Sequence, residues 1–163
     1  MATFKTETII AASLERVWAF HQDVKAALPR LSPAEAGVVI ESVEPSPPEL
    51  GTRVTARAIV PMRGEMRWVA KYVEFVPPRA VVFGAEARFA DEQESGPFKF
   101  WWHAHEFEAI DDKTTRLRDH ITYKVGLGPI GWVADVLIVR RQLTAMFRHR
   151  ARVLGEVFPG EGK

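Results

Sequence analysis

The chain has 163 residues, 47% of them hydrophobic and 26% charged, a composition typical of one soluble globular domain and not of a disordered chain. It contains no cysteine, which excludes disulfides, thiolate metal sites and cysteine nucleophiles and agrees with a reducing compartment. The formal net charge of +1 provides no global field for nucleic acid, and no apolar stretch is long enough to cross a membrane. We therefore expect a cytoplasmic protein without a signal peptide, a membrane span or a nucleic-acid partner.

The first predicted elements are one strand and two short helices. Residues 3–10 alternate between polar and apolar side chains and are rich in β-branched types, which predicts a strand. Ser13 is a suitable N-cap, and Val17, Trp18 and Phe20 supply apolar positions for a short helix behind it. A second short helical segment is expected over residues 23–28.

The middle of the chain has a period of two, which predicts a meander of antiparallel strands separated by short turns with Gly, Pro or Asp. The predicted strands cover residues 38–43, 53–60, 65–75, 80–88, 98–110 and 115–125. Together with the first strand they give a seven-stranded antiparallel sheet.

After Pro129 the apolar period returns to 3.6, which predicts one helix of more than 25 residues. Its apolar stripe consists of Val133, Val136, Leu137, Leu143, Met146, Phe147, Val153, Leu154 and Val157. One long helix cannot fill a strongly curved sheet from end to end, so we expect a cavity between them. The fold class is α+β, with residues 1–163 forming a single domain.

The segment GPFKFWWHAHEF, residues 96–107, places Trp101, His103, His105 and Phe107 on one face of a strand. On the next strand Leu117, Asp119, Ile121 and Tyr123 form the apolar set and are expected to face inward. If residues 111–113 form a three-residue loop, Ile110 pairs with Thr114. His105 then lies opposite Asp119, His103 opposite Ile121 and Trp101 opposite Tyr123, and an imidazole can reach the carboxylate.

Three interpretations of the two histidines stay open. A His-x-His pair with a nearby carboxylate could bind a transition metal, but His21, His120 and His149 are expected on other elements, so no metal site is predicted. His105 oriented by Asp119 could instead be a polar anchor that exchanges a proton with a ligand carbonyl or hydroxyl. Alternatively, the buried groups satisfy each other and have no ligand contact.

The long helix also has a basic face with Arg141, Arg148, His149 and Arg152, which we expect to be a solvated surface. Arg140 lies within the apolar stripe and is expected to reach the edge of the helix, the alternative being an anion anchor inside the cavity. The sequence contains no phosphate-binding glycine loop, no Gly-x-Ser-x-Gly elbow and no metalloprotease motif.

The chain resembles the START-like or SRPBCC superfamily, which has the helix-grip fold, over nearly its whole length. The resemblance rests on LERVWAFHQDV and LSP near the N-terminus, on DEQESGPFKFWWHAHEF and RDHITYKV, on Gly128 and Gly131, and on Met146, Phe147 and Arg150. More narrowly, it is similar to small bacterial SRPBCC ligand-binding proteins sometimes labelled cell-division inhibitor-like. The resemblance implies a curved seven-stranded sheet with two short helices after the first strand and a long C-terminal helix over a cavity. It implies no catalytic residue set.

The leading hypothesis is a protein that binds an apolar or aromatic small molecule, without a further cofactor, between the sheet and the long helix. The predicted ligand-binding residues are Trp68, Tyr72, Trp101, His103, His105, Phe107, Asp119, Tyr123, Met146 and Phe147. The alternative is a cyclase, aromatase or dehydratase that uses His105 and Asp119 as a general acid/base pair. A third hypothesis is an interaction module acting through Arg148 and Arg152. A homodimer stays open.

Overall fold

A seven-stranded antiparallel sheet forms the frame of the protein in the computed structural model, which describes residues 1–60, 64–79, 84–126 and 138–160. The strands are β1 (Ala2–Ile10), β2 (Val39–Glu44), β3 (Arg53–Val60), β4 (Gly64–Val76), β5 (Glu86–Ser95), β6 (Phe100–Asp111) and β7 (Thr114–Lys124). Their order in the sheet is β1-β7-β6-β5-β4-β3-β2. Six of the seven strands follow one another as a meander, and β1 joins the sheet beside β7, as the sequence predicts.

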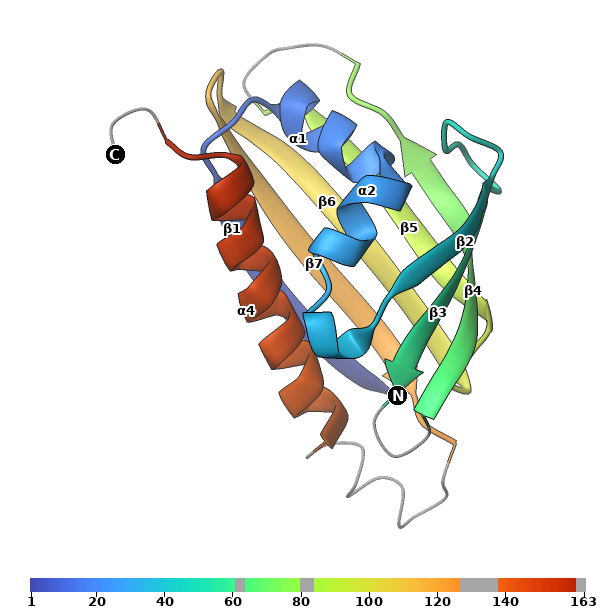
Figure 1. Ribbon diagram of the computed structural model, residues 1–163. Helices are drawn as coiled ribbons and strands as arrows, with labels where there is room; N and C mark the ends of the chain where they lie inside the picture. Colours follow the sequence, from blue (N-terminus) through green and yellow to red (C-terminus); the bar gives the residue numbers. More distant parts are fainter. Residues whose placement is uncertain (61–63, 80–83, 127–137, 161–163) are drawn as a thin grey trace.

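The helices all lie on the concave face of this sheet (Figure 1). They are α1 (Leu14–Gln22), α2 (Val24–Arg30), the short 3-10 helix η1 (Ala34–Ala36) and α4 (Arg140–Val157). Asp23 begins α2, since its Oδ1 accepts a hydrogen bond from the Ala26 backbone N–H at 3.3 Å. The stripe predicted for Val133, Val136 and Leu137 lies outside the described residues. No described helix combines the length and apolar character needed to cross a bilayer.

The pairing of β6 with β7 has the predicted register, although the turn between them is shorter than expected. His105 lies opposite Asp119, His103 opposite Ile121 and Trp101 opposite Tyr123. Asp111, however, pairs with Thr114, and the register shifts between Ala109 and Asp111. The Asp111 side chain accepts a hydrogen bond from the Lys113 N–H at 2.9 Å, which favours a two-residue turn. The bulge at Ile110 absorbs the extra residue and preserves the predicted pairs.

Strand β5 lies later in the chain than the sequence pattern indicates. The prediction of a strand over residues 80–88 was wrong, because the observed strand is Glu86–Ser95, and residues 80–83 lie outside the described residues. The polar residues from Asp91 to Ser95 do not have the alternating apolar pattern that predicts a strand. The backbone of β5 nevertheless pairs with β4 on one side and with β6 on the other. The shift brings Asp91 opposite His103, on the concave face of the sheet.

Two hydrophobic clusters fill the space between the sheet and the helices. The larger one packs α1, α2 and the end of α4 around Trp18, whose ring contacts Phe89 and Phe107 at 5.8 and 5.5 Å between centroids. The smaller one contains Trp101, Ile121, Tyr123, Leu143 and Phe147 and joins the sheet to the first turns of α4.

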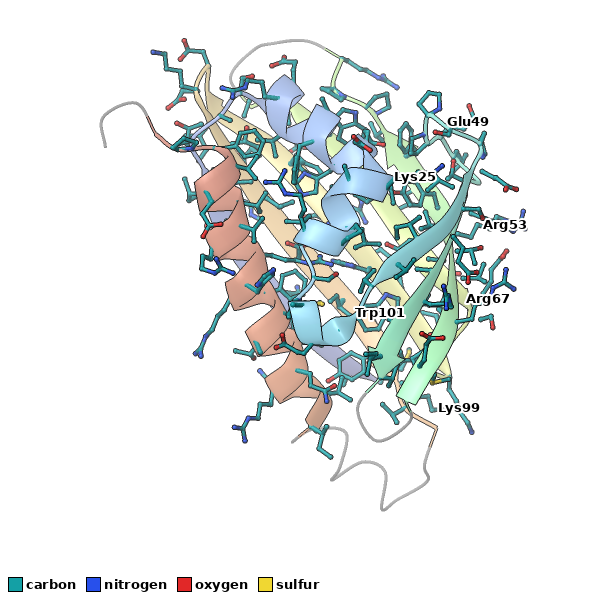
Figure 2. The ribbon with its side chains drawn as sticks, in the orientation of Figure 1. Lys25, Glu49, Arg53, Arg67, Lys99 and Trp101 are labelled. Carbon is teal, nitrogen blue, oxygen red and sulfur yellow. The ribbon has the colours of Figure 1, made fainter. Side chains whose placement is uncertain are left out.

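The convex face of the sheet is polar and carries ion pairs, two of which reach across an intervening strand, from β3 to β5 and from β4 to β2. Arg53 Nε lies 2.8 Å from Glu94 Oε2, and Arg67 Nε lies 3.1 Å from Glu41 Oε2. Figure 2 shows Arg53 and Arg67 at the outside of the molecule and Trp101 between the sheet and the helices. The apolar side chains of the strands therefore face the helices, and any small-molecule site is expected on this concave side.

Candidate ligand-binding cavity

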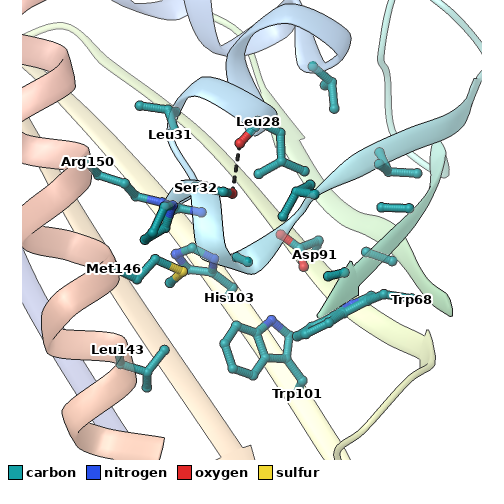
Figure 3. Close-up of a pocket in the computed structure, with 18 of the residues that line it drawn as sticks. Leu28, Leu31, Ser32, Trp68, Asp91, Trp101, His103, Leu143, Met146 and Arg150 are labelled. Atoms are coloured by element: carbon teal, nitrogen blue, oxygen red, sulfur yellow. Dashed lines mark hydrogen bonds between the residues drawn. The ribbon is translucent and has the colours of Figure 1, made fainter. Parts of the chain in front are cut away.

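A cavity of about 530 Å³ lies between the concave face of the sheet and the helices. It borders both hydrophobic clusters, and most of its wall is apolar (Figure 3). The wall includes Leu28, Leu31, Val54, Ala56, Ala58, Trp68, Tyr72, Phe89, Phe98, Trp101, Leu143 and Met146. A volume of this size is in the range that holds a drug-sized ligand.

Three aromatic rings form one end of the cavity. Trp68 meets Trp101 edge to face, with 5.1 Å between ring centroids, and Phe98 lies 4.9 Å from Trp101. Gln93 fixes the segment that carries Phe98, because its amide donates to Phe98 O at 2.7 Å and accepts from Phe98 N at 3.3 Å. A Cβ at Gly96 would lie 2.5 Å from Gln93 Oε1, so a larger residue there would displace the Gln93 amide from its hydrogen bonds to Phe98.

A buried cluster of polar groups forms another part of the wall. His103 Nε2 donates a hydrogen bond to Asp119 Oδ1 at 3.0 Å. His105 Nδ1 lies 2.8 Å from the same oxygen but outside hydrogen-bonding geometry, so this contact is electrostatic. The two imidazoles are 3.9 Å apart, and His105 stacks on Phe89 at 4.3 Å. Asp119 therefore lies behind both rings and orients them toward the cavity.

Burial sets the charge state of this cluster. It lowers the pKa of His105 to about 4, helped by His103 and opposed by Asp119, and it also lowers the pKa of His103. Burial alone would raise the pKa of Asp119, but His105 and His103 hold that pKa well below its ordinary value. At neutral pH the cluster therefore contains one carboxylate and two neutral imidazoles, which can accept a hydrogen bond or a proton from a bound molecule.

Further polar side chains line the same cavity without being among the predicted site residues, and three of them have shifted pKa values. His21 comes from α1, Asp91 from β5 and Arg150 from α4. His21 Nδ1 donates to Val17 O at 2.8 Å, which leaves Nε2 as a lone-pair acceptor, and burial lowers the pKa of His21 to about 4. Burial also raises the pKa of Asp91 to about 6.

Asp91, His103 and His105 offer the donor set of a metal site. One ligand atom from each lies within 4.8 Å of the others. Two imidazoles and a carboxylate suit several divalent transition metals, and Asp119 occupies the outer position that commonly orients ligating histidines. The Arg150 guanidinium is close enough to lower the pKa values of both histidines, and its positive charge opposes a cation there. The expectation of no metal stays a prediction.

The sequence matches, over residues 1–158, the family described as polyketide cyclase / dehydrase and lipid transport. The chain belongs to this family. The predicted START-like superfamily is thereby confirmed, and the helix-grip architecture agrees with it. No curated protein matches the chain.

Solved structures of family-like folds cover almost the whole chain at low sequence identity. A START superfamily protein from Mycobacterium smegmatis has a TM-score of 0.64 at 15% identity, covering 96% of both chains. Norcoclaurine synthase from Thalictrum flavum, a point mutant in complex with a transition state analogue, has a TM-score of 0.61 at 16% identity, covering 96% of this chain and 95% of its own. The di-domain ARO/CYC protein BexL of the BE-7585A biosynthetic pathway has a TM-score of 0.66 at 16% identity. The match covers 99% of this chain and 48% of the BexL chain. At these identities the likeness shows the fold alone.

The predicted binding residues divide into a wall and a supporting layer. Trp68, Tyr72, Trp101, His103, His105 and Met146 line the cavity. Phe107, Asp119, Tyr123 and Phe147 are buried but do not line it. Phe147 stacks on Phe4 at 5.3 Å, and Phe107 packs against His21 at 5.1 Å. These four residues lie behind the cavity wall and support it.

The remaining predicted polar groups lie away from the cavity. Arg140 is exposed, as expected, and so are Arg148 and Arg152 on the outer face of α4. Arg152 forms an ion pair with Glu156 at 2.7 Å, and His149 Nε2 donates to Arg30 O at 3.0 Å. The basic face of α4 is thus a surface feature separate from the polar cluster.

Local patterns in the sequence contain signals for the missed residues. His21 continues the stripe of Leu14, Val17 and Trp18 on α1, and all four residues are buried. Arg150 follows Leu143 by seven positions and Phe147 by three, so helical spacing puts it on the inner face of α4. Asp91 alternates with Ala87 and Phe89 once β5 is placed correctly. Polar residues that continue an apolar period are therefore the signal that could have found this part of the site.

Proposed function

We propose that the protein binds an apolar or aromatic small molecule in the cavity between the sheet and α4. The observation that supports this function is the cavity itself, a volume of about 530 Å³ that is lined by residues of both hydrophobic clusters. Interiors are otherwise packed densely, and apolar pockets with a few convergent polar groups are typical of ligand sites. The family description names both cyclization or dehydration of polyketides and lipid transport, which are activities on apolar molecules.

Native mass spectrometry of the purified protein, compared with its denatured mass, tests this function. We expect an organic adduct that disappears on denaturation. Met146→Trp adds an indole to the cavity wall and is expected to lose the adduct. The matched control is Ala145→Trp, which adds the same ring to the exposed neighbouring position of α4 and is expected to keep it. Equal adduct retention by the two variants would contradict binding in the cavity.

A second function is favoured by the arrangement of Asp119, His103 and His105. A carboxylate that holds neutral imidazoles at a cavity wall is the arrangement of a general acid/base pair. In this case the protein is an enzyme of cyclase, aromatase or dehydratase type, and His105 transfers a proton on a polyketide-like substrate. A His105→Ala variant that keeps the adduct but stops its conversion would favour the enzyme, whereas equal loss of both would favour binding alone.

The cytoplasmic location, the homodimer, the absence of nucleic-acid partners and the cell-division inhibitor-like subgroup stay predictions. The basic face of α4 is the surface on which the interaction hypothesis depends. Charge reversal at Arg148 and Arg152 is its test, since an unchanged partner pulldown would remove that hypothesis.

A further inference from the structure

Arg150 brings a guanidinium into the cavity without a carboxylate partner among the described residues. Figure 3 shows its side chain extending from α4 toward His103. Its buried Nε has no hydrogen-bond partner among the described residues, and its Cζ lies 4.9 Å from the centroid of the Phe147 ring. Arginines on the convex face of the sheet differ, since Arg53, Arg88 and Arg118 each have a glutamate oxygen within 2.8 to 3.2 Å.

A guanidinium whose buried Nε has no hydrogen bond and that forms no direct ion pair is costly, so a complementary group is expected where Arg150 meets the cavity. Burial lowers the pKa of Arg150, although an arginine keeps its charge at neutral pH. The carboxylates of Asp119 and Asp91 attract it through space but form no ion pair with it. Asp119 is already occupied by the two imidazoles.

Arg150 differs from the other polar groups around the cavity by its permanent charge. His21 and His103 each use one ring N–H inside the protein, on Val17 O and on Asp119, and present a lone pair with the other nitrogen. Among the described wall residues, Arg150 is the one lysine or arginine, so it is the group best suited to an anion. Guanidinium groups bind carboxylates through two parallel hydrogen bonds, which fixes the orientation of the bound group.

We propose that the ligand of this cavity is an apolar carboxylic acid whose carboxylate pairs with Arg150 while its hydrocarbon part lies against the Trp68, Phe98 and Trp101 end. This inference rests on the proposed binding function and names the class of ligand. Asp91, for which no side-chain hydrogen bond or ion pair is found among the described residues, faces the same space and is the group that disfavours a second negative charge. Its neutralisation is expected to strengthen binding of the acid.

Isothermal titration at pH 7.5 with two matched pairs of probes tests the inference. The pairs are 2-naphthoate with 2-naphthamide and decanoate with decanamide, in which charge changes while shape is kept. We expect each acid to bind about tenfold or more tightly than its amide. Arg150→Met is expected to remove this preference by weakening the acids about tenfold while changing the amides less than about threefold. Arg150→Lys is expected to keep part of the preference.

Three controls make the outcome specific. Arg148→Met removes an exposed positive charge two residues away on α4 and is expected to leave both affinities unchanged. Arg150→Met exchanges a buried cation for an apolar chain of similar length, so it is expected to fold, which its urea unfolding curve checks. Asp91→Asn is expected to bind the acids more tightly than the parent protein.

Each other outcome overturns the inference in its own way. Equal affinities for acid and amide, or a preference that survives Arg150→Met, would reject the carboxylate at Arg150 and leave the proposed binding function intact. If none of the four compounds binds, the proposed function fails and the inference fails with it. Tight binding of Zn²⁺ alone that Asp91→Asn abolishes would assign the polar cluster to a cation instead.

Discussion

One oxygen atom of Asp119 contacts the imidazoles of both His103 and His105, and both rings line the cavity. The alternating pattern of β6 and β7 was sufficient to predict this arrangement, because a sheet places every second residue on the same face. The same reasoning did not find Arg150 or Asp91. A charged residue on an inner face is energetically unfavourable, so sequence reasoning assigns it to the surface unless the cavity that accepts it is known.

Removal of Asp119 is expected to destabilise the protein. In Asp119→Ala the buried N–H of His103 loses its acceptor, and the free energy of unfolding is expected to fall by about 1–3 kcal/mol in urea denaturation. Glu106→Ala is the control, because Glu106 pairs with Arg88 on the half-exposed side of β6 and is expected to cost less than about 1 kcal/mol. Similar losses in both variants would show that Asp119 has no special structural role.

Helices and strands were predicted at the right residues where the spacing of apolar side chains is regular. They were placed at the wrong residues where polar side chains interrupt that spacing. Strand β6 and the described part of α4 follow their periods of 2 and 3.6, whereas β5 carries the run from Asp91 to Ser95 and was placed too early. The two-residue turn after β6 depends on one hydrogen bond of the Asp111 side chain, a local contact that periodicity does not encode.

Two neighbouring positions of α4 are expected to differ sharply in their contribution to stability. Phe147 packs against Phe4 and His103, so Phe147→Ala is expected to lower the free energy of unfolding by about 3–5 kcal/mol. Met146 borders the cavity, and Met146→Ala is expected to cost about 2 kcal/mol or less, since fewer contacts are lost there. Chemical denaturation of both variants checks the order, and a reversed order would contradict the described orientation of α4.

For the molecule as a whole, the buried titratable groups set how stability depends on pH. The pKa values of His21 and His105 are lowered from 6.5 to about 4, so between these pH values the unfolded chain binds protons that the folded protein does not. Asp91 acts in the opposite direction, because its pKa is raised from 3.8 to about 6. His21 and His105 outweigh one carboxyl group, and His103, whose pKa burial also lowers, acts in their direction. Stability is therefore expected to fall as the pH falls from 6.5 to 4.

The expected slope corresponds to a net uptake of about one proton on unfolding, or roughly 1.4 kcal/mol per pH unit. Urea midpoints measured between pH 4 and 7 give this slope. His21→Gln and His105→Gln are each expected to reduce it. A slope of opposite sign would mean that Asp91 dominates.

The cavity that borders both hydrophobic clusters links the lifetime of the protein to its ligand. A molecule that fills the gap binds the folded chain and not the unfolded one, and at one hundred times its Kd it adds about 2.7 kcal/mol to the free energy of unfolding. Ligand-free protein therefore unfolds more often than ligand-bound protein and is degraded first by proteases. The amount of this protein in a cell would then follow the supply of the compound that it binds, without a separate sensor.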